Sequence, residues 1–167
     1  MRVLHHHPLY GASRTVRLLL AERNLVYLPK METPWDRHED FLTINPSGEV
    51  PVLVTEDGDV LSGTMVIAEY LEETEESDNS LIWGTAAERA EIRRLADWFE
   101  RKFVTEVGTP LLNERYIKRV AARGNPSSQV MRAATTNLHI HLDYIDWLAE
   151  QGNWLAGKAM SLADLSA

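Results

Sequence analysis

Apolar residues in the first part of the chain recur both as short runs and at helical spacing. Val16, Leu19 and Leu20 follow the i, i+3, i+4 spacing of a helix that buries one face, and Ser13 stands where it can cap that helix. The short runs are typical of buried strands. We predict strands at 3–7, 25–28, 52–54 and 60–61, a short helix from 36 through 42 and a helix at 65–72. The order β-α-β-α-β-β-α indicates an α/β domain.

The apolar run that begins at Val50 has a proline at its entrance. Asn45, Pro46 and Gly48 are turn residues that deliver the chain into the run. Pro51 has no N–H to give to a sheet, so we expect it at the first residue of a strand or at a bend, where a cis Val50–Pro51 bond is one way to turn the chain. A cis bond would leave the main-chain groups of Val50 ready to pair with an extended peptide.

Helical periodicity dominates the second half. An acidic run at 72–80 indicates an interdomain linker. Thr85 and Glu88 have the spacing of a capping box that begins a long amphipathic helix. We expect Pro110 to interrupt this helix, a continuation from 111 to 123, and another helix from about 127 to 150. The resulting boundaries are 1–74 for the α/β domain, 75–84 for the linker and 85–167 for an all-α domain.

The last residues have a second capping-box pattern. Ser161 and Asp164 stand at that spacing just before an apolar helix start, and the sequence ends within the first turn of this helix. A helix with an apolar face needs neighbours that cover it. We therefore expect an incomplete helical domain, with core surface exposed around Trp147, Leu148 and Trp154.

Composition excludes several classes of function. The 167 residues carry a formal net charge of −8, which argues against a dedicated nucleic-acid binder, and contain no cysteine, which excludes a disulfide scaffold, a Cys-ligated metal and a cysteine nucleophile. No window approaches the roughly 20 apolar residues of a membrane span, so we expect a cytoplasmic protein with no integral membrane segment. His5, His6 and His7 alternate faces of a strand and cannot all converge on one metal ion.

Two motifs carry a family resemblance. Asn-Pro-x-Gly-x-Val-Pro-x-Leu at 45–53 resembles the loop and cis-proline strand of the cytosolic glutathione transferases. Leu-Ala-Gly at 155–157 with Ser-Leu-Ala-Asp at 161–164 resembles the start of the central helix in their helical domain. The resemblance implies a thioredoxin-like N-terminal domain followed by a transferase-type C-terminal helical domain, here truncated. It also implies glutathione as ligand or substrate, with no other cofactor.

In such an enzyme one donor near the first helix lowers the pKa of the glutathione thiol. The resemblance makes Tyr10 and Ser13 the candidates and sets His6 where tyrosine-type members carry their tyrosine. A helix cap is the alternative role for Ser13, and a structural role is the alternative for Tyr10. The main chain at Val50 and Pro51 would hold the tripeptide.

A second family contact departs from the pattern. The family holds the γ-glutamyl group with an acidic residue or glutamine followed by serine or threonine, and the matching positions here are Gly63 and Thr64. Thr64 keeps the hydroxyl, and the helix N-terminal amides still favour a carboxylate. Gly63 supplies no side chain. Losing a charge-assisted contact costs about 1.5–3 kcal/mol, which argues against ordinary transferase activity.

Cationic residues gather in the helical half. Arg115, Arg119 and Arg123 stand at i, i+4 and i+8 with Lys118 beside them, and only Lys118 has a partner in the same helix, Glu114. A solvated face balanced by acidic residues elsewhere is one interpretation. A surface that accepts an acidic protein or peptide is the other.

A narrower resemblance covers nearly the whole chain. Trp-Phe-x-Arg-Lys-Phe at 98–103 and His-Leu-Asp-Tyr-Ile at 141–145 resemble the alphaproteobacterial, FtsZ-localised division proteins that have the transferase fold. This implies a homodimer that binds FtsZ filaments at the division site, with little or no glutathione chemistry. Trp35, in a loop, and His141 join the cationic residues as candidates for partner contact. The alternatives are a glutathione S-transferase that conjugates glutathione to electrophiles and a structural homologue with another small ligand.

Overall fold

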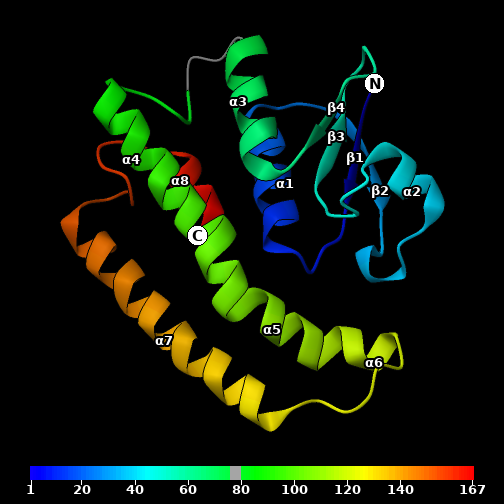
Figure 1. The fold of residues 1–167 in the computed structure, drawn as a ribbon. Helices are drawn as coiled ribbons and strands as arrows, with labels where there is room; N and C mark the ends of the chain where they lie inside the picture. The colour runs from blue at the N-terminus through cyan, green and yellow to red at the C-terminus, as the bar shows by residue number, and fades with distance from the viewer. Residues whose placement is uncertain (76–79) are drawn as a thin grey trace. The chain divides into compact units, whose positions relative to one another are not determined.

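The computed structural model describes residues 1–75 and 80–167 and divides into two compact units, Met1–Asn79 and Ser80–Ala167. Each unit is described by itself (Figure 1). Part of the linker expected at 75–84, residues 76–79, lies outside the described residues.

The first unit contains a mixed four-stranded sheet. The strands are β1 (Arg2–His6), β2 (Tyr27–Met31), β3 (Val52–Val54) and β4 (Val60–Ser62), in the order β2-β1-β3-β4. β1 pairs in parallel with β2 and antiparallel with β3, so that Leu4 lies opposite both Pro29 and Leu53. β3 and β4 are antiparallel. The short turn at 55–59 permits that antiparallel pairing, whereas β1 and β2 need the helix between them.

Three α-helices and a short 3₁₀ helix complete this unit. They are α1 (Gly11–Glu22), the 3₁₀ helix η1 (Pro34–Asp36), α2 (Glu39–Ile44) and α3 (Thr64–Thr74). Figure 1 shows α1 and α3 on one side of the strands and α2 on the other. Leucine, isoleucine and valine side chains from the strands and from α1 and α3 form the core, each fully buried and each worth about 1.5–3 kcal/mol. They are Leu4, Val16, Leu19, Leu20, Val52, Leu53, Ile67 and Leu71.

The second strand begins two residues later than the sequence predicts. Asn24 has a left-handed backbone, with φ of 53°, and the N–H of Leu25 donates to the carbonyl of Leu20 at 2.9 Å. These residues therefore close the end of α1 and cannot join the sheet, so β2 starts at Tyr27.

One continuous helical run opens the second unit. It consists of α4 (Ala86–Asp97), a π-helical stretch η2 (Trp98–Gly108), α5 (Thr109–Leu112), a second π-helical stretch η3 (Asn113–Ile117) and α6 (Lys118–Val120). The capping box predicted for its start is confirmed, because the Thr85 side chain accepts from the N–H of Glu88 while the Glu88 carboxylate accepts from the N–H of Thr85.

The expected interruption at Pro110 is wrong. Gly108 and Thr109 keep right-handed helical backbones, with φ and ψ of −60° and −58° and of −62° and −48°. In a π helix an N–H bonds to the carbonyl five residues back instead of four. Pro110 follows directly, as the second residue of α5, so its missing N–H falls where the two bonding patterns change.

The long helix α7 (Ser128–Gln151) and the short helix α8 (Leu162–Ser166) complete the unit. Ser127 caps α7, and the predicted Ser161–Asp164 capping box is present. Of the three residues expected to be exposed, Trp147 and Trp154 are 54% and 38% exposed, but Leu148 is only 5% exposed. Leu148 is buried because Leu95, Phe99 and Ala163 pack into one cluster with it.

Candidate functional site

The loop after β1 presents Tyr10, the first candidate donor. Tyr10 is the N-cap residue of α1, with an extended backbone, and its half-buried ring packs on the cluster of Phe41, Val50 and Val52. Burial raises the pKa of the Tyr10 hydroxyl, and the negative charge of Glu49 raises it further. The phenol therefore stays protonated at neutral pH and can donate a hydrogen bond.

Ser13, the second candidate donor, is neither the helix cap nor accessible. The helix begins two residues earlier, so Ser13 lies in its first turn with 0% exposure. Its Oγ accepts a hydrogen bond from the main-chain N–H of His7 at 3.3 Å. The expected capping role is wrong because Tyr10 occupies that position. In this conformation no substrate thiol reaches the hydroxyl.

The Val50–Pro51 bond is cis, as the resemblance to the glutathione transferases implies. The carbonyl of Pro51 accepts from the N–H of Gly63 at 3.0 Å, which joins the start of β3 to the start of α3. Gly63 is the N-cap residue of α3 and has a φ of 92°. A Cβ atom at Gly63 would find no other atom within 4 Å, so the place where the family carries a polar side chain is open space.

Thr64 follows as the first residue of α3 and is buried. Its hydroxyl donates to the carbonyl of Ala12 at 3.4 Å. The contact brings the start of α3 beside the first turn of α1, two residues after Tyr10. Within this unit, Tyr10 and the N-terminus of α3 are therefore close neighbours.

The histidines of β1 and of the residue after it face different surroundings, as the alternation predicts. His5 stacks on Phe41 and its Nδ1 lies 2.7 Å from a carboxylate oxygen of Glu32, a buried pair that nothing in the sequence pattern indicated. His6 is buried on the side of Arg17; burial lowers its pKa, and the charges of Arg17 and His7 lower it further. His6 is therefore a buried imidazole that is neutral at neutral pH.

Trp35 lies in η1 and is half-buried. Its indole meets the imidazole of His7 edge-on, with 5.0 Å between ring centroids, and Tyr10 approaches the same imidazole at 5.7 Å. Burial lowers the pKa of His7. The three rings form one aromatic group at the loop after β1, and the tryptophan leaves part of its surface open to solvent.

Among the described residues, no group of three or more histidine, aspartate or glutamate side chains is placed so that it could hold a metal ion. Within the same described part of the chain, no helix is both long and apolar enough to cross a membrane.

The expected row of arginines is broken. Arg115 and Arg119 are exposed, but α6 ends at Val120 and Ala122 has a left-handed backbone with φ of 50°. Arg123 follows this turn and is off the helix, so it does not continue the row. The predicted pair in the same helix is confirmed, because Lys118 Nζ lies 2.8 Å from the carboxylate of Glu114.

His141 is not available as a surface contact in this structure, because it is only 1% exposed. Its Nδ1 accepts from the indole N–H of Trp98 at 3.1 Å, and its Nε2 lies 2.9 Å from a carboxylate oxygen of Glu106. Phe103 meets the ring edge-on. Glu106 also pairs with Lys102, and the hydrogen bonds from Lys102 and His141 lower its pKa. Burial of the imidazole under aromatic residues makes His141 part of the core.

Comparison with known proteins assigns the chain to a family. A family model for the glutathione S-transferase N-terminal domain matches residues 12–74. FtsZ-localized protein A of Caulobacter vibrioides is 43% identical over 169 residues, which cover 99% of this chain and 74% of that protein. The chain belongs to the glutathione S-transferase-like family.

Solved structures of transferase-like proteins share the fold. A glutathione S-transferase from Rhodospirillum rubrum is 49% identical with a TM-score of 0.94, and FzlA from C. crescentus is 43% identical with a TM-score of 0.93. Each comparison covers 99% of this chain and 74% of the other chain. The fold expected from the sequence, a thioredoxin-like domain followed by a transferase-type helical domain, is confirmed.

Proposed function

We propose that this chain is a cell-division protein of the transferase-like family that binds FtsZ filaments at the division site, with little or no glutathione chemistry. The observation that carries the proposal is the 43% identity to FtsZ-localized protein A over 99% of the chain. That identity extends through the helical unit, which carries most of the candidates for partner contact.

The geometry of the N-terminal unit supports the low activity towards glutathione. Gly63 offers no side chain to the γ-glutamyl group, and the Ser13 hydroxyl is fully buried against the main chain. Tyr10 is the one remaining candidate donor. A missing charge-assisted contact costs about 1.5–3 kcal/mol, which weakens binding by more than tenfold.

The residues proposed to contact FtsZ differ in their exposure to solvent and in their ion pairing. Arg115 and Arg119 are exposed in the helical unit and have no ion-pair partner among the described residues, whereas Lys118 is held by Glu114. Trp35 offers a half-exposed indole in the other unit. Arginine and tryptophan are the residue types that contribute most to protein interfaces. Arg123 remains a candidate, and the buried His141 does not.

Co-sedimentation with polymerised FtsZ tests the proposal. We expect Arg115→Glu to lower the apparent affinity about tenfold, because reversing an exposed charge opposes an acidic partner, and we expect Trp35→Arg to lower it as well. The matched control is Arg89→Glu, which reverses an exposed charge on α4 that, like Arg115, has no ion-pair partner among the described residues. Circular dichroism shows whether each variant keeps its fold. If the wild-type chain stays in the supernatant, or if Arg89→Glu has the same effect as Arg115→Glu, the proposal fails.

We also propose that the chain forms a homodimer, as the family resemblance implies. Sedimentation equilibrium measures the mass directly. A single species at the mass of one chain across the concentrations used for FtsZ binding would contradict this part of the proposal.

A second candidate function is conjugation of glutathione to electrophiles. It is favoured by the position of the protonated Tyr10 phenol beside the first turns of α1 and α3. Steady-state conjugation assays with a chromogenic electrophile test it. If the wild-type chain shows turnover and a folded Tyr10→Phe variant shows none, this activity is established. That result would contradict the proposal of little or no glutathione chemistry.

A further inference from the structure

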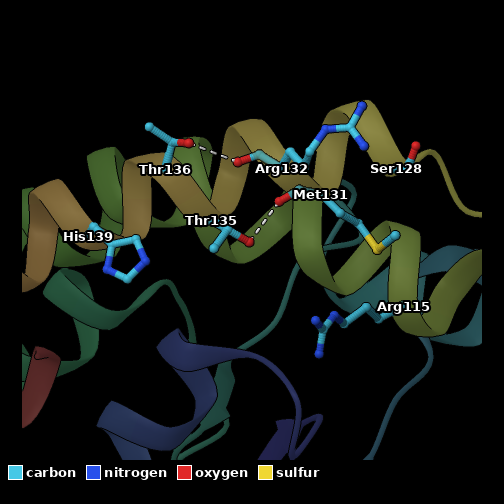
Figure 2. A pocket seen from close by; sticks show the side chains of 7 residues that line it. All are labelled: Arg115, Ser128, Met131, Arg132, Thr135, Thr136 and His139. Carbon is cyan, nitrogen blue, oxygen red and sulfur yellow. Dashed lines mark hydrogen bonds between the residues drawn. The ribbon is translucent and has the colours of Figure 1, made fainter.

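An open pocket of about 460 Å³ lies in the helical unit, and none of its lining residues is one considered for glutathione. Figure 2 shows that one of its lining side chains, Arg115, comes from η3 and that the rest come from α7. The residues on α7 are Ser128, Met131, Arg132, Thr135, Thr136 and His139. They recur at helical spacing and, apart from Met131, form a polar stripe along α7.

The pocket has a strong excess of positive charge for a protein with a net charge of −8. Arg115 and Arg132 line it, no carboxylate does, and neither arginine has an ion-pair partner among residues 1–75 and 80–167. Ser128 is the first residue of α7, but the carboxylate of Glu114 already accepts from the N–H of Ser127 at that helix start. The two arginines are therefore the sources of positive potential that favour an anion.

The wall that carries Arg115 is anchored to α7 by the preceding residue. Glu114 is buried, and its carboxylate accepts from the N–H of Ser127 at 2.6 Å and from Lys118 at 2.8 Å. The hydrogen bonds from Lys118 and from the N–H of Ser127 lower the pKa of Glu114. The positive charge of Lys118 balances the negative charge of the Glu114 carboxylate. Glu114 thus ties the segment that carries Arg115 to the start of α7. Its carboxylate pairs with Lys118 and forms no ion pair with Arg115.

The pocket also has an apolar part. Met131 extends from α7 toward the segment that carries Arg115 (Figure 2). The hydroxyls of Thr135 and Thr136 donate to the carbonyls of Met131 and Arg132 at 2.8 and 3.1 Å. Since these two protons are already used, the threonines offer mainly their methyl groups. The remaining side-chain donors for an anion are the two guanidinium groups, the Ser128 hydroxyl and the His139 ring.

We propose that this pocket binds a small organic acid, with its carboxylate between Arg115 and Arg132 and its apolar body against Met131 and the threonine methyl groups. Guanidinium groups match a carboxylate with paired hydrogen bonds, and the volume is within the range of small-molecule sites. Arg115 is also a candidate for FtsZ contact, but the pocket proposal goes beyond that function because it concerns a small ligand, and titration of the chain in the absence of FtsZ tests it separately.

Isothermal titration calorimetry with 4-phenylbutyrate tests the charge requirement. The matched ligand is 4-phenyl-1-butanol, which keeps the apolar body and lacks the carboxylate. We expect the acid to bind at least about tenfold more tightly than the alcohol, because a charge-assisted pair is lost. Binding of the acid should weaken as salt is raised. Equal affinities, or no binding of the acid at millimolar concentration, would overturn the proposal.

Variants test the place of binding. We expect Arg115→Gln and Arg132→Gln each to weaken 4-phenylbutyrate about tenfold. Thr135→Leu should block the apolar part of the pocket. The matched control is Arg119→Gln, which removes an exposed charge from the same helical run but does not line the pocket. If Arg119→Gln weakens binding as much as Arg115→Gln does, the acid responds to the general charge of the surface and the site is wrong.

Discussion

The Nε2 atom of His141 lies 2.9 Å from a carboxylate oxygen of Glu106, at the edge of the helical core. Because the indole N–H of Trp98 donates to Nδ1, the ring proton is on Nε2 and is donated to Glu106. The imidazole thus links α7 to the π-helical stretch that carries both partners.

We expect His141→Ala to lower the free energy of unfolding by about 2–4 kcal/mol, because it leaves a cavity and an indole N–H without an acceptor. Urea denaturation followed by circular dichroism measures the loss. The adjacent Ile140→Ala is the control, since Ile140 is exposed and its removal should cost less than about 0.5 kcal/mol. Similar losses in the two variants would show that His141 has no structural role.

The buried hydroxyl of Ser13 leads to a prediction about stability. We expect Ser13→Ala to lower the free energy of unfolding by about 1–2 kcal/mol, because the N–H of His7 loses its acceptor at a buried position. Ser47→Ala is the matched control, since the Ser47 hydroxyl also accepts from a main-chain N–H, that of Glu49, but is exposed. Its loss should be close to zero. A Ser13→Ala protein of unchanged stability that loses thiol chemistry would instead support a catalytic role.

Restoring a carboxylate at position 63 should strengthen glutathione binding. We expect Gly63→Asp to raise the affinity for glutathione about tenfold, because the new carboxylate can pair with the γ-glutamyl ammonium group. The space for it is open, but the φ of 92° disfavours any side chain and should cost about 1 kcal/mol of stability.

Gly58→Asp is the matched control for this change. Gly58 has a φ of 95° and equally open surroundings, and it lies in the turn before β4. Calorimetry should show stronger glutathione binding for Gly63→Asp alone, and thermal unfolding should show a similar loss for both. An unchanged glutathione affinity in Gly63→Asp would mean that the missing carboxylate is not what limits binding.

Acid should weaken the capping box at the start of α4. The main-chain N–H of Thr85, the ammonium group of Lys158 and the Thr85 hydroxyl together lower the pKa of Glu88 from 4.5 to about 2. A carboxyl with a lower pKa in the folded state adds stability above its unfolded pKa and loses it as the pH falls through the folded value. The contribution of Glu88 is therefore lost between 4.5 and about 2.

Thermal unfolding of the wild type and of Glu88→Gln across that pH range measures the effect. The amide can keep the capping-box geometry but does not titrate. We expect the stability difference between the two proteins to shrink as the pH falls. A constant difference would show that the ionisation of Glu88 does not contribute to stability.

Local sequence signals predicted most of the secondary structure correctly. Thr85 with Glu88 and Ser161 with Asp164 are caps whose partners lie three residues away. A proline at the entrance of a strand made a cis Val50–Pro51 bond one way to turn the chain, and the bond is cis. Such features depend on neighbours in the chain, so a single sequence contains the information. The resemblance to the glutathione transferases rested on the same kind of short motif.

The errors concern a helix start, a buried histidine and a helix end. Serine is a residue type that often caps helices, so Ser13 was expected at the cap. The loop after β1 ends at Tyr10, however, and Ser13 lies inside the first turn of α1. His141 was a candidate for partner contact, yet it is buried, and Trp98, 43 residues away, provides a hydrogen bond that permits the burial. Arg123 leaves the row of arginines because the backbone turns at Ala122.

For the candidate site, the sequence alone determined that position 63 has no side chain and that Tyr10, Ser13 and Thr64 carry the available hydroxyls. Only the tertiary structure decided which of these hydroxyls is accessible and that Arg115 and the polar stripe of α7 line one pocket. The physical reason is that residue type and helical period are properties of neighbouring positions along the chain. Burial and electrostatic potential depend on which distant segments pack together.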